Sequence, residues 1–82
     1  MSIREEVIEA LCAKAAVLFG VDSAALGPDT RFEEDLHAKS VNIVQFSAVL
    51  EDIYDVEVPF MEFKRKKTFG EAADYIAQML GE

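Results

Sequence analysis

The stretch from Phe32 to Tyr54 reads FEEDLHAKSVNIVQFSAVLEDIY, and its character changes at Ser40. Before Ser40 the residues are mostly polar and follow no regular period. After it, apolar residues recur at the spacing of an α-helix, at Ile43, Phe46, Leu50, Ile53 and Tyr54. We therefore predict a helix that follows Ser40 and runs to about Tyr54, with its apolar face in the core.

A second, narrower apolar stripe lies beside this face. It consists of Val41, Val44 and Ala48. A helix that is buried on one side only needs a single apolar stripe. We therefore expect part of this helix to face a partner protein.

A long loop, from Val21 to Lys39, precedes the helix. Gly27-Pro28-Asp29 is a turn signal, and the apolar residues around it are isolated. A loop of this length in so small a domain is unusual unless it is functional or held in place. We expect four apolar side chains to pin it to the core: Val21, Leu26, Phe32 and Leu36.

An amphipathic helix is predicted before the loop. Ser2 and Glu5 have the spacing of a capping box, and Gly20 is a typical stop signal. Apolar residues recur between them at close to the helical period, at Ile3, Val7, Leu11, Ala15 and Leu18.

Two further helices are predicted after residue 54. Pro59 suits the first turn of a short helix from about Phe60 to Lys64, and Thr68 and Glu71 repeat the capping-box spacing. The inward face of the last helix is then formed by Phe69, Ala72, Ala73, Ile76 and Leu80.

These elements predict an all-α fold: a small helical bundle with three main helices, one short helix and a long loop between the first two. Val56-Glu57-Val58 alternates like a strand, but three residues without a partner strand form no sheet. A chain of 82 residues has room for one domain, which we place at residues 1–82.

Charge excludes several functions. Sixteen acidic residues against eight basic ones give a net charge of −8, which repels nucleic acid and attracts basic partners. We expect no leader peptide, and no apolar run approaches the roughly 20 residues that span a bilayer. Cys12 lies in a helical apolar pattern and is expected to be a buried, inert thiol. We expect a cytoplasmic monomer that binds no nucleic acid and enters no membrane.

Few side chains could support catalysis. His37 is the only histidine, and an acidic run beside it in a loop is weak evidence for a metal site. The sequence has no glycine-rich phosphate loop, paired histidines or nucleophile elbow. We therefore predict no catalytic residue and no metal.

Ser40 is the remaining candidate, because it stands where the loop becomes a helix. One interpretation is an ordinary N-cap whose hydroxyl accepts a hydrogen bond from an amide of the first turn. The other is a covalently held phosphate, which a helix N-terminus stabilises through its free amides and dipole. Residue type and position alone leave both open.

The sequence around Ser40 resembles that of acyl carrier proteins. FEEDLHAKSV, residues 32–41, is similar to their Phe-x-x-Asp-Leu-Gly-x-Asp-Ser-Leu stretch, in register. The similarity continues through Val44, Leu50 and Tyr54 to VEVP at residues 56–59 and TFGEAADYI at residues 68–76. It therefore covers nearly the whole chain, and the family's fold has the element order predicted above.

The resemblance implies a function as a carrier, not as an enzyme. A phosphopantetheinyl transferase would attach 4'-phosphopantetheine from coenzyme A to Ser40, and acyl-transferring or condensing enzymes would use the thioester on its thiol. A flexible tether raises the effective concentration of substrate at each docked enzyme. In this family the acyl chain can also enter a cleft between helices, for which the candidates here are Ile43, Phe46, Leu50 and Ile76.

Several residues depart from the family pattern at the surface that partners recognise. Lys39 stands where Asp usually precedes the serine, Val41 replaces Leu and His37 replaces Gly. Asn42 and Gln45 occupy positions that are often acidic. Surface charge sets encounter rate and partner choice, so we expect a dedicated partner set. The predicted partner-binding residues are Lys39, Val41, Asn42, Val44, Gln45, Ala48, Glu51 and Asp52.

The resemblance favours an acyl carrier in fatty-acid, specialised lipid or polyketide-type biosynthesis, and the sequence leaves two alternatives open. The chain could carry amino acids or other small acids, or act as an interaction module in which Ser40 is only a helix cap. The basic run from Lys64 to Lys67 is interpreted either as a solvated helix end or as a second docking patch.

Overall fold

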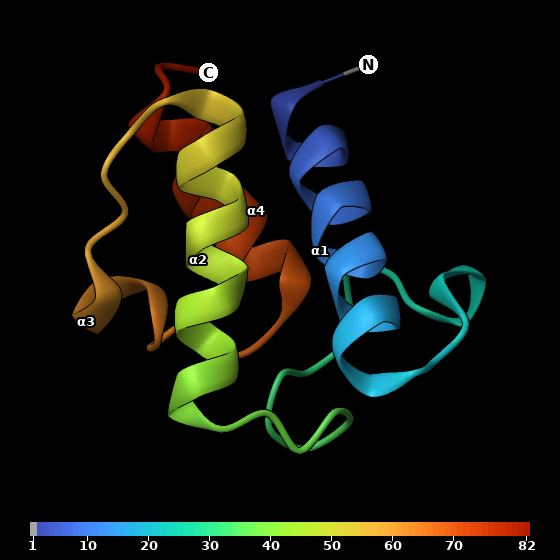
Figure 1. The fold of residues 1–82 in the computed structure, drawn as a ribbon. Helices are drawn as coiled ribbons and strands as arrows, with labels where there is room; N and C mark the ends of the chain where they lie inside the picture. The colour runs from blue at the N-terminus through green and yellow to red at the C-terminus, as the bar shows by residue number, and fades with distance from the viewer. Residues whose placement is uncertain (1) are drawn as a thin grey trace.

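The computed structural model describes residues 2–82 and is helical (Figure 1). Its elements are α1 (Ile3–Phe19), a 3-10 turn η1 (Ser23–Ala25), α2 (Ser40–Tyr54), α3 (Phe60–Phe63) and α4 (Phe69–Met79). No β-strand occurs among residues 2–82, where the one extended pairing is an isolated bridge between Arg31 and Thr68. The predicted all-α bundle of three main helices and one short helix is confirmed.

The first helix begins and ends where the sequence predicts. The Ser2 hydroxyl accepts a hydrogen bond from the Glu5 amide at 3.1 Å, and the Glu5 carboxylate accepts one in return from the Ser2 amide. Gly20 ends the helix at a φ of 68°, a left-handed conformation that glycine adopts without a steric penalty. The capping box and the glycine stop are confirmed.

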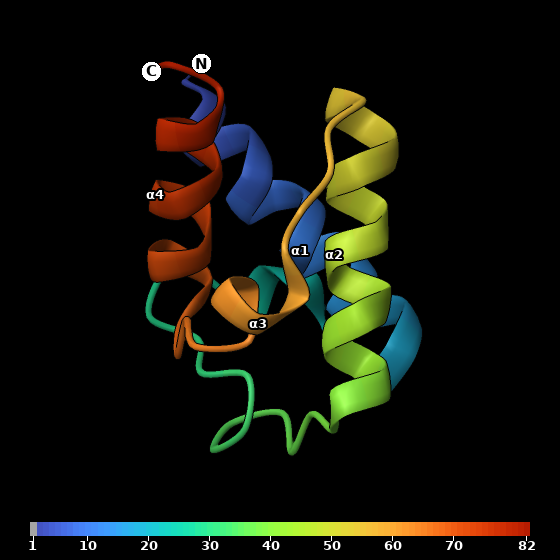
Figure 2. The ribbon, with the colours of Figure 1, turned by 90° about the vertical axis from the view of Figure 1, so that its left-hand side faces the viewer.

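The helices surround a common interior. α1 packs against both α4 and α2, and α3 packs against α2 (Figures 1 and 2). Both chain ends lie at the same end of the bundle, where the Ile3 amide donates a hydrogen bond to the Glu82 carboxylate at 3.0 Å. The long loop and the start of α2 form the opposite end of the bundle.

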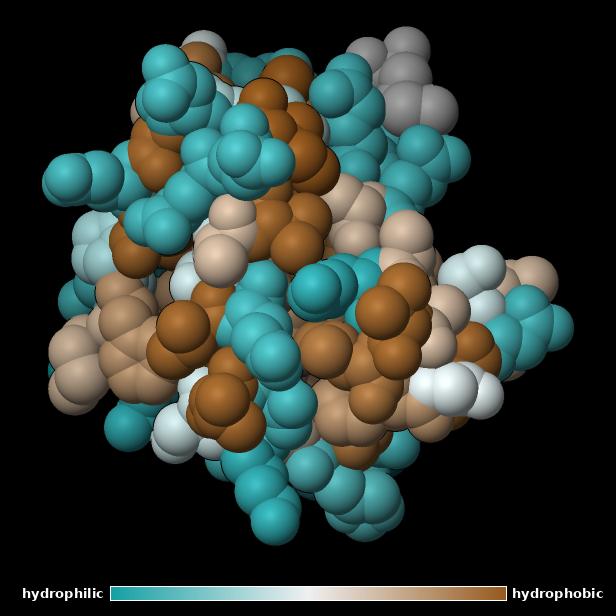
Figure 3. All heavy atoms as spheres, in the orientation of Figure 1, coloured by the Kyte–Doolittle hydropathy of each residue, from teal (hydrophilic) through white to brown (hydrophobic). Residues whose placement is uncertain are grey.

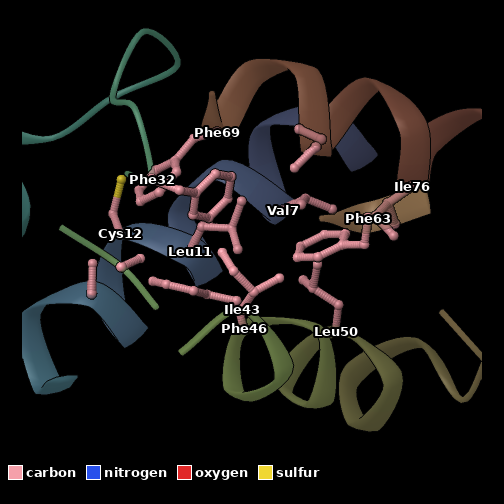
Figure 4. Packing of buried hydrophobic residues seen from close by; sticks show 14 of the residues in the cluster. Val7, Leu11, Cys12, Phe32, Ile43, Phe46, Leu50, Phe63, Phe69 and Ile76 are labelled. Atoms are coloured by element: carbon pink, nitrogen blue, oxygen red, sulfur yellow. The ribbon is translucent and has the colours of Figure 1, made fainter. Parts of the chain in front are cut away.

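A cluster of phenylalanines fills the interior (Figure 4). The ring of Phe32, which belongs to the loop, lies 5.2 Å from that of Phe46 on α2 and 4.9 Å from that of Phe69 on α4. Phe63 of α3 completes the group at 6.1 Å. One loop side chain thus contacts three different helices, and tilted or edge-on aromatic pairs at such distances add to the stabilisation from burial alone.

The loop is held to the core as predicted. Phe32 and Leu36 are buried, while Val21 and Leu26 are half-buried against the core. Backbone hydrogen bonds add to this anchoring, because the Phe32 amide donates to the carbonyl of Lys67 and the Phe69 amide to that of Thr30. The sequence did not predict η1, which the Asp22 carboxylate caps at the Ala24 amide.

Two local predictions are wrong. Ile53 is 53% exposed, because it falls at one edge of the buried stripe of α2, whereas Ser47 at the opposite edge is buried. The buried Ser47 hydroxyl is satisfied by donating to the Val44 carbonyl at 2.9 Å. At the start of α4, Thr68 accepts from the Glu71 amide, but the Glu71 carboxylate accepts from Lys67 and not from Thr68, so the predicted box is half formed.

No helix within residues 2–82 combines the length and the hydrophobicity needed to cross a lipid bilayer.

Gly70 allows α4 to approach the loop closely. Its amide donates to the Pro28 carbonyl at 2.8 Å, and a Cβ added there would stand 3.0 Å from the same backbone oxygen. Gly70→Ala should therefore lower the free energy of unfolding by about 1 to 2 kcal/mol, because the cost of shifting the backbone to admit a methyl group exceeds the gain in helix propensity. Urea denaturation measures the loss.

Gly27→Ala is the matched control, since a Cβ at Gly27 meets nothing within 4 Å. It should leave stability within about 0.5 kcal/mol of the parent chain. Equal effects of the two substitutions would show that the close contact at Gly70 does not affect the free energy of unfolding.

Candidate functional site

Ser40 is the first residue of α2, and its side chain is exposed at the end of the bundle that faces the long loop. Its hydroxyl makes no hydrogen bond to any residue between 2 and 82. The amides of Ser40 and Val41 likewise find no acceptor in that range. The hydroxyl is therefore accessible to an incoming reagent.

The interpretation of Ser40 as the N-cap of this helix is wrong. Lys39 holds the N-cap position in extended conformation, and its carbonyl accepts from the amides of Asn42 and Ile43. Asn42 reaches back from the first turn, and its Oδ1 accepts from the Lys39 amide at 2.9 Å. No side chain between residues 2 and 82 caps the free amides of Ser40 and Val41.

A tight turn positions the segment that leads to Ser40. The His37 amide donates to the Glu33 carbonyl, and the Ala38 amide donates to the Phe32 carbonyl. His37 has a φ of 54° in the left-handed region, which costs a residue with a Cβ about 1 to 2 kcal/mol. This is the position at which the resembled pattern has glycine, and the conformation explains that preference.

An arginine clamp stabilises the same turn. The Arg31 guanidinium contacts the Glu34 carboxylate at 2.6 Å and the Asp35 carboxylate at 2.8 Å. The hydrogen bond from the Arg31 side chain is the main cause that holds the pKa of Asp35 below its usual value, and a second bond from the Arg31 amide acts in the same direction.

A surface hollow of about 560 Å³ opens beside Ser40. It lies between the segment leading into α2 and the chain that follows α3, whose backbones can be followed in Figure 2. Its apolar lining comes from Phe32, Ala38, Ile43 and Phe60.

Cations dominate the charged lining of the hollow. Five of the chain's eight basic residues take part, against two carboxylates, those of Glu33 and Glu34. The five are Arg31, Lys39, Lys64, Lys66 and Lys67.

The lysines of this group keep their charges largely uncompensated. Within residues 2–82, Arg31 alone among the five forms ion pairs. Lys64 lies over the ring of Phe60 at 5.9 Å and Lys66 over that of Tyr75 at 4.9 Å, contacts that stabilise a cation without neutralising it. Arg65, in the same basic run, contacts Glu62 at 3.7 Å and lies outside the lining.

The predicted partner-binding residues on α2 fall into two groups, one exposed and one engaged in hydrogen bonds within the chain. The stripe of Val41, Val44 and Ala48 is exposed, with Val41 exposed to 62%, and apolar side chains gather over α2 between polar ones (Figure 3). Asp52 is exposed as well.

Three other residues of that set are engaged within the chain. Asn42 caps α2 and also donates from Nδ2 to the Gln45 side chain at 3.2 Å. The Glu51 carboxylate accepts from the Val58 amide at 2.8 Å and so holds the chain after α2 in place. Their polar atoms are therefore less available to a partner than those of Lys39 or Asp52.

The four predicted acyl-cleft residues are all buried in the core (Figure 4). Ile43 also lines the hollow beside Ser40, whereas Phe46, Leu50 and Ile76 do not. The structure therefore brings one of the four next to the candidate attachment point.

The surroundings of Ser40 were not predicted from the sequence. Three residues of the basic run from Lys64 to Lys67 line the hollow at Ser40 together with Phe60. The only signal in the sequence was the concentration of positive charge in an acidic chain, and its location depends on how α3 packs.

The donor set suits a phosphodiester at Ser40. An exposed hydroxyl, free amides at a helix start and nearby lysines would together stabilise a negative group attached there. This chemistry agrees with the group that the resemblance implies.

Comparisons with known proteins point the same way. Residues 9–76, which include Ser40, match a family described as "Phosphopantetheine attachment site". A protein named "Acyl carrier protein" from Rubrobacter xylanophilus is 33% identical, over 92% of this chain and 93% of its own length. Another of that name, from Lactobacillus acidophilus, is 35% identical over 94% of this chain and 96% of its own.

The Arg31 clamp predicts a pH effect. Because the folded-state pKa of Asp35 is depressed, the clamp's stabilisation is present above the unfolded aspartate pKa of about 3.9 and is lost as pH falls through the folded value. Arg31→Gln should raise the pKa of Asp35 and lower stability at neutral pH but not in strong acid. A ¹³C NMR titration of the Asp35 carboxyl checks this, and Arg65→Gln, which should leave that pKa unchanged, is the control. An unaltered titration in Arg31→Gln would contradict the assignment.

Proposed function

This chain belongs to the acyl carrier protein family, and from that premise we propose that Ser40 bears a 4'-phosphopantetheine arm whose thiol carries acyl groups as thioesters. Members of this family are carriers and not enzymes, and phosphopantetheine is the group that they bear. Residues 1–82 form one carrier domain in this proposal. The domain acts as a cosubstrate in fatty-acid, specialised lipid or polyketide-type biosynthesis.

The observation that carries this proposal is the exposed Ser40 hydroxyl, which no residue between 2 and 82 binds. A serine that served only as a helix cap would have its oxygen engaged by an amide of the first turn. Here the Ser40 oxygen accepts from no such amide, and Asn42 accepts from the Lys39 amide. This supports the carrier function over the interaction-module alternative, in which Ser40 is only a cap.

The Ser40 hydroxyl acts as the nucleophile in the attachment reaction. Its oxygen bonds to phosphorus while a P–O bond in the pyrophosphate of coenzyme A breaks. Adenosine 3',5'-bisphosphate leaves, and the hydroxyl proton passes to a base of the transferase. Afterwards the free amides at the start of α2 and the adjacent Lys39 favour the negative charge of the phosphodiester.

Mass spectrometry of the intact chain tests the attachment point. Incubation with a phosphopantetheinyl transferase and coenzyme A should add one phosphopantetheine, and Ser40→Ala should abolish the adduct. Ser23→Ala, which removes another exposed hydroxyl, should leave it in place. An adduct that survives in Ser40→Ala, or its absence from the parent chain, would overturn the proposal.

We also propose that partner enzymes dock on the exposed side of α2, over Val41, Val44, Ala48 and Asp52, with Lys39 at its edge. The transferase and the acyl-transferring or condensing enzymes would share this surface. Charge at the rim of an interface acts mainly on the rate of encounter. Lys39 therefore selects against partners whose basic surfaces suit an aspartate at this position.

Lys39→Asp tests this selection. Modification by a housekeeping transferase should accelerate roughly threefold to tenfold, because an attractive charge replaces a repulsive one beside the hydroxyl. Lys14→Asp changes the net charge equally but lies on α1 outside the hollow, and should have little effect. Equal rates for Lys39→Asp and the parent chain would remove Lys39 from partner selection.

A further inference from the structure

Positive charge is concentrated in one place on this acidic chain. With a net charge of −8, an even distribution would leave every surface negative. The hollow beside Ser40 instead gathers five of the eight basic residues, against the carboxylates of Glu33 and Glu34. Glu34 and Asp35 hold the guanidinium of Arg31. The other four cations of the lining are lysines, and none of them forms an ion pair with any residue between 2 and 82.

These lysines lie on two walls of the hollow. Lys39 is adjacent to Ser40, at the edge of the docking surface on α2. The other three, Lys64, Lys66 and Lys67, belong to the chain after α3 and are called the lysine wall here. The hollow separates this wall from the segment that leads into α2 (Figure 2). An anion held by the lysine wall would therefore share the hollow with the Ser40 hydroxyl.

An aromatic ring borders the lysine wall. Phe60 is half-buried and lines the hollow, and the Lys64 ammonium lies 5.9 Å from the centroid of its ring. A ring beside several cations suits a purine base that carries phosphate groups, because the base stacks on the ring while the phosphates accept hydrogen bonds from the lysines. The hollow, at about 560 Å³, has the size of a small-molecule site. Its concave form favours such a ligand over the surface of an acidic protein.

The attachment reaction brings a ligand of this kind to Ser40. When the Ser40 oxygen bonds to phosphorus, the P–O bond that breaks lies roughly in line with the bond that forms. The electron pair of the broken bond stays on the leaving group, adenosine 3',5'-bisphosphate, and the hydroxyl proton passes to a base of the transferase. The leaving group thus lies on the side of the phosphorus away from Ser40. For a donor that enters the hollow, the lysine wall is on that side.

We propose that the lysine wall binds the adenosine 3',5'-bisphosphate end of coenzyme A during attachment, so that the carrier itself supplies part of the donor's binding site. The inference rests on the proposed attachment of the arm to Ser40. The lysines donate hydrogen bonds to the 3'- and 5'-phosphates, and adenine stacks on Phe60. Fixed cations also stabilise the negative charge that develops on the leaving phosphate. The pantetheine part of the donor needs no contact with this wall.

A binding experiment on the unmodified full chain tests the site without a transferase. The probe is adenosine 3',5'-bisphosphate, and adenosine 5'-monophosphate, which lacks the 3'-phosphate, is the matched comparison. In NMR titrations at low salt the bisphosphate should bind about fivefold more tightly, because its second phosphate gains charge-assisted hydrogen bonds. Its amide shifts should concentrate in residues 60–67.

Lys64→Gln combined with Lys67→Gln should abolish this preference and leave the two affinities within about twofold of each other. Both lysines are exposed, so the core stays intact, whereas Lys66 is retained because it lies over the ring of Tyr75. The matched control combines Arg65→Gln with Lys14→Gln. It removes the same number of charges outside the lining and should keep the preference.

The rate of attachment links this binding to the reaction. At limiting coenzyme A, the variant that combines Lys64→Gln with Lys67→Gln should be modified about threefold more slowly than the parent chain, because the leaving phosphate loses its counter-charges. A role of the lysines in docking gives the opposite sign with a basic housekeeping transferase, since removal of positive charge beside the hydroxyl favours the encounter.

Three results would overturn the proposal. Equal affinities of the parent chain for the two nucleotides would show that the lysine wall does not bind the 3'-phosphate. Loss of the preference in the control variant would show an effect of net charge alone. An equal or faster rate of attachment without Lys64 and Lys67 would assign these lysines to partner docking. Failure of the Ser40 attachment itself appears separately, as a missing mass adduct on the parent chain, and leaves the nucleotide titrations unaffected.

Discussion

The packing of Phe32 is the contact on which the rest of this structure depends. Its ring lies within 6.1 Å of three other phenylalanine rings, each on a different helix, although Phe32 itself belongs to the loop. A small bundle buries little apolar surface, so a single large side chain at its centre has a large share of the stability. The same residue sets the path of the segment that ends at Ser40, so core packing and site geometry have a common origin.

Periodicity and capping signals predicted the helices well because both depend on neighbouring residues. Ser2 with Glu5, and Gly20, define α1 through contacts within one turn. Prediction failed at the edges and at the start of α2. Ser47 and Ile53 lie at opposite edges of its buried face, and only Ser47 is buried. Lys39 and not Ser40 holds the N-cap position, and Asn42, three residues after Lys39, accepts from its amide.

The surroundings of Ser40 could not be predicted from the sequence. Residues 31–43 and 60–67 approach each other only because α3 packs against α2 and because Thr30, Phe32, Lys67 and Phe69 form two backbone hydrogen bonds. Local patterns carry no information about such an approach. The sequence showed that the basic residues cluster, and the fold determines what they surround.

Those two backbone hydrogen bonds also make the two sides of the hollow one unit. They join the loop directly to the chain before α4, in addition to the packing of α3 against α2 and of Phe32 in the core. Protein engineers who recombine carrier domains should therefore transplant residues 30–43 together with residues 60–69 as one cassette. Exchange of either segment alone would separate the serine from the lysines opposite it.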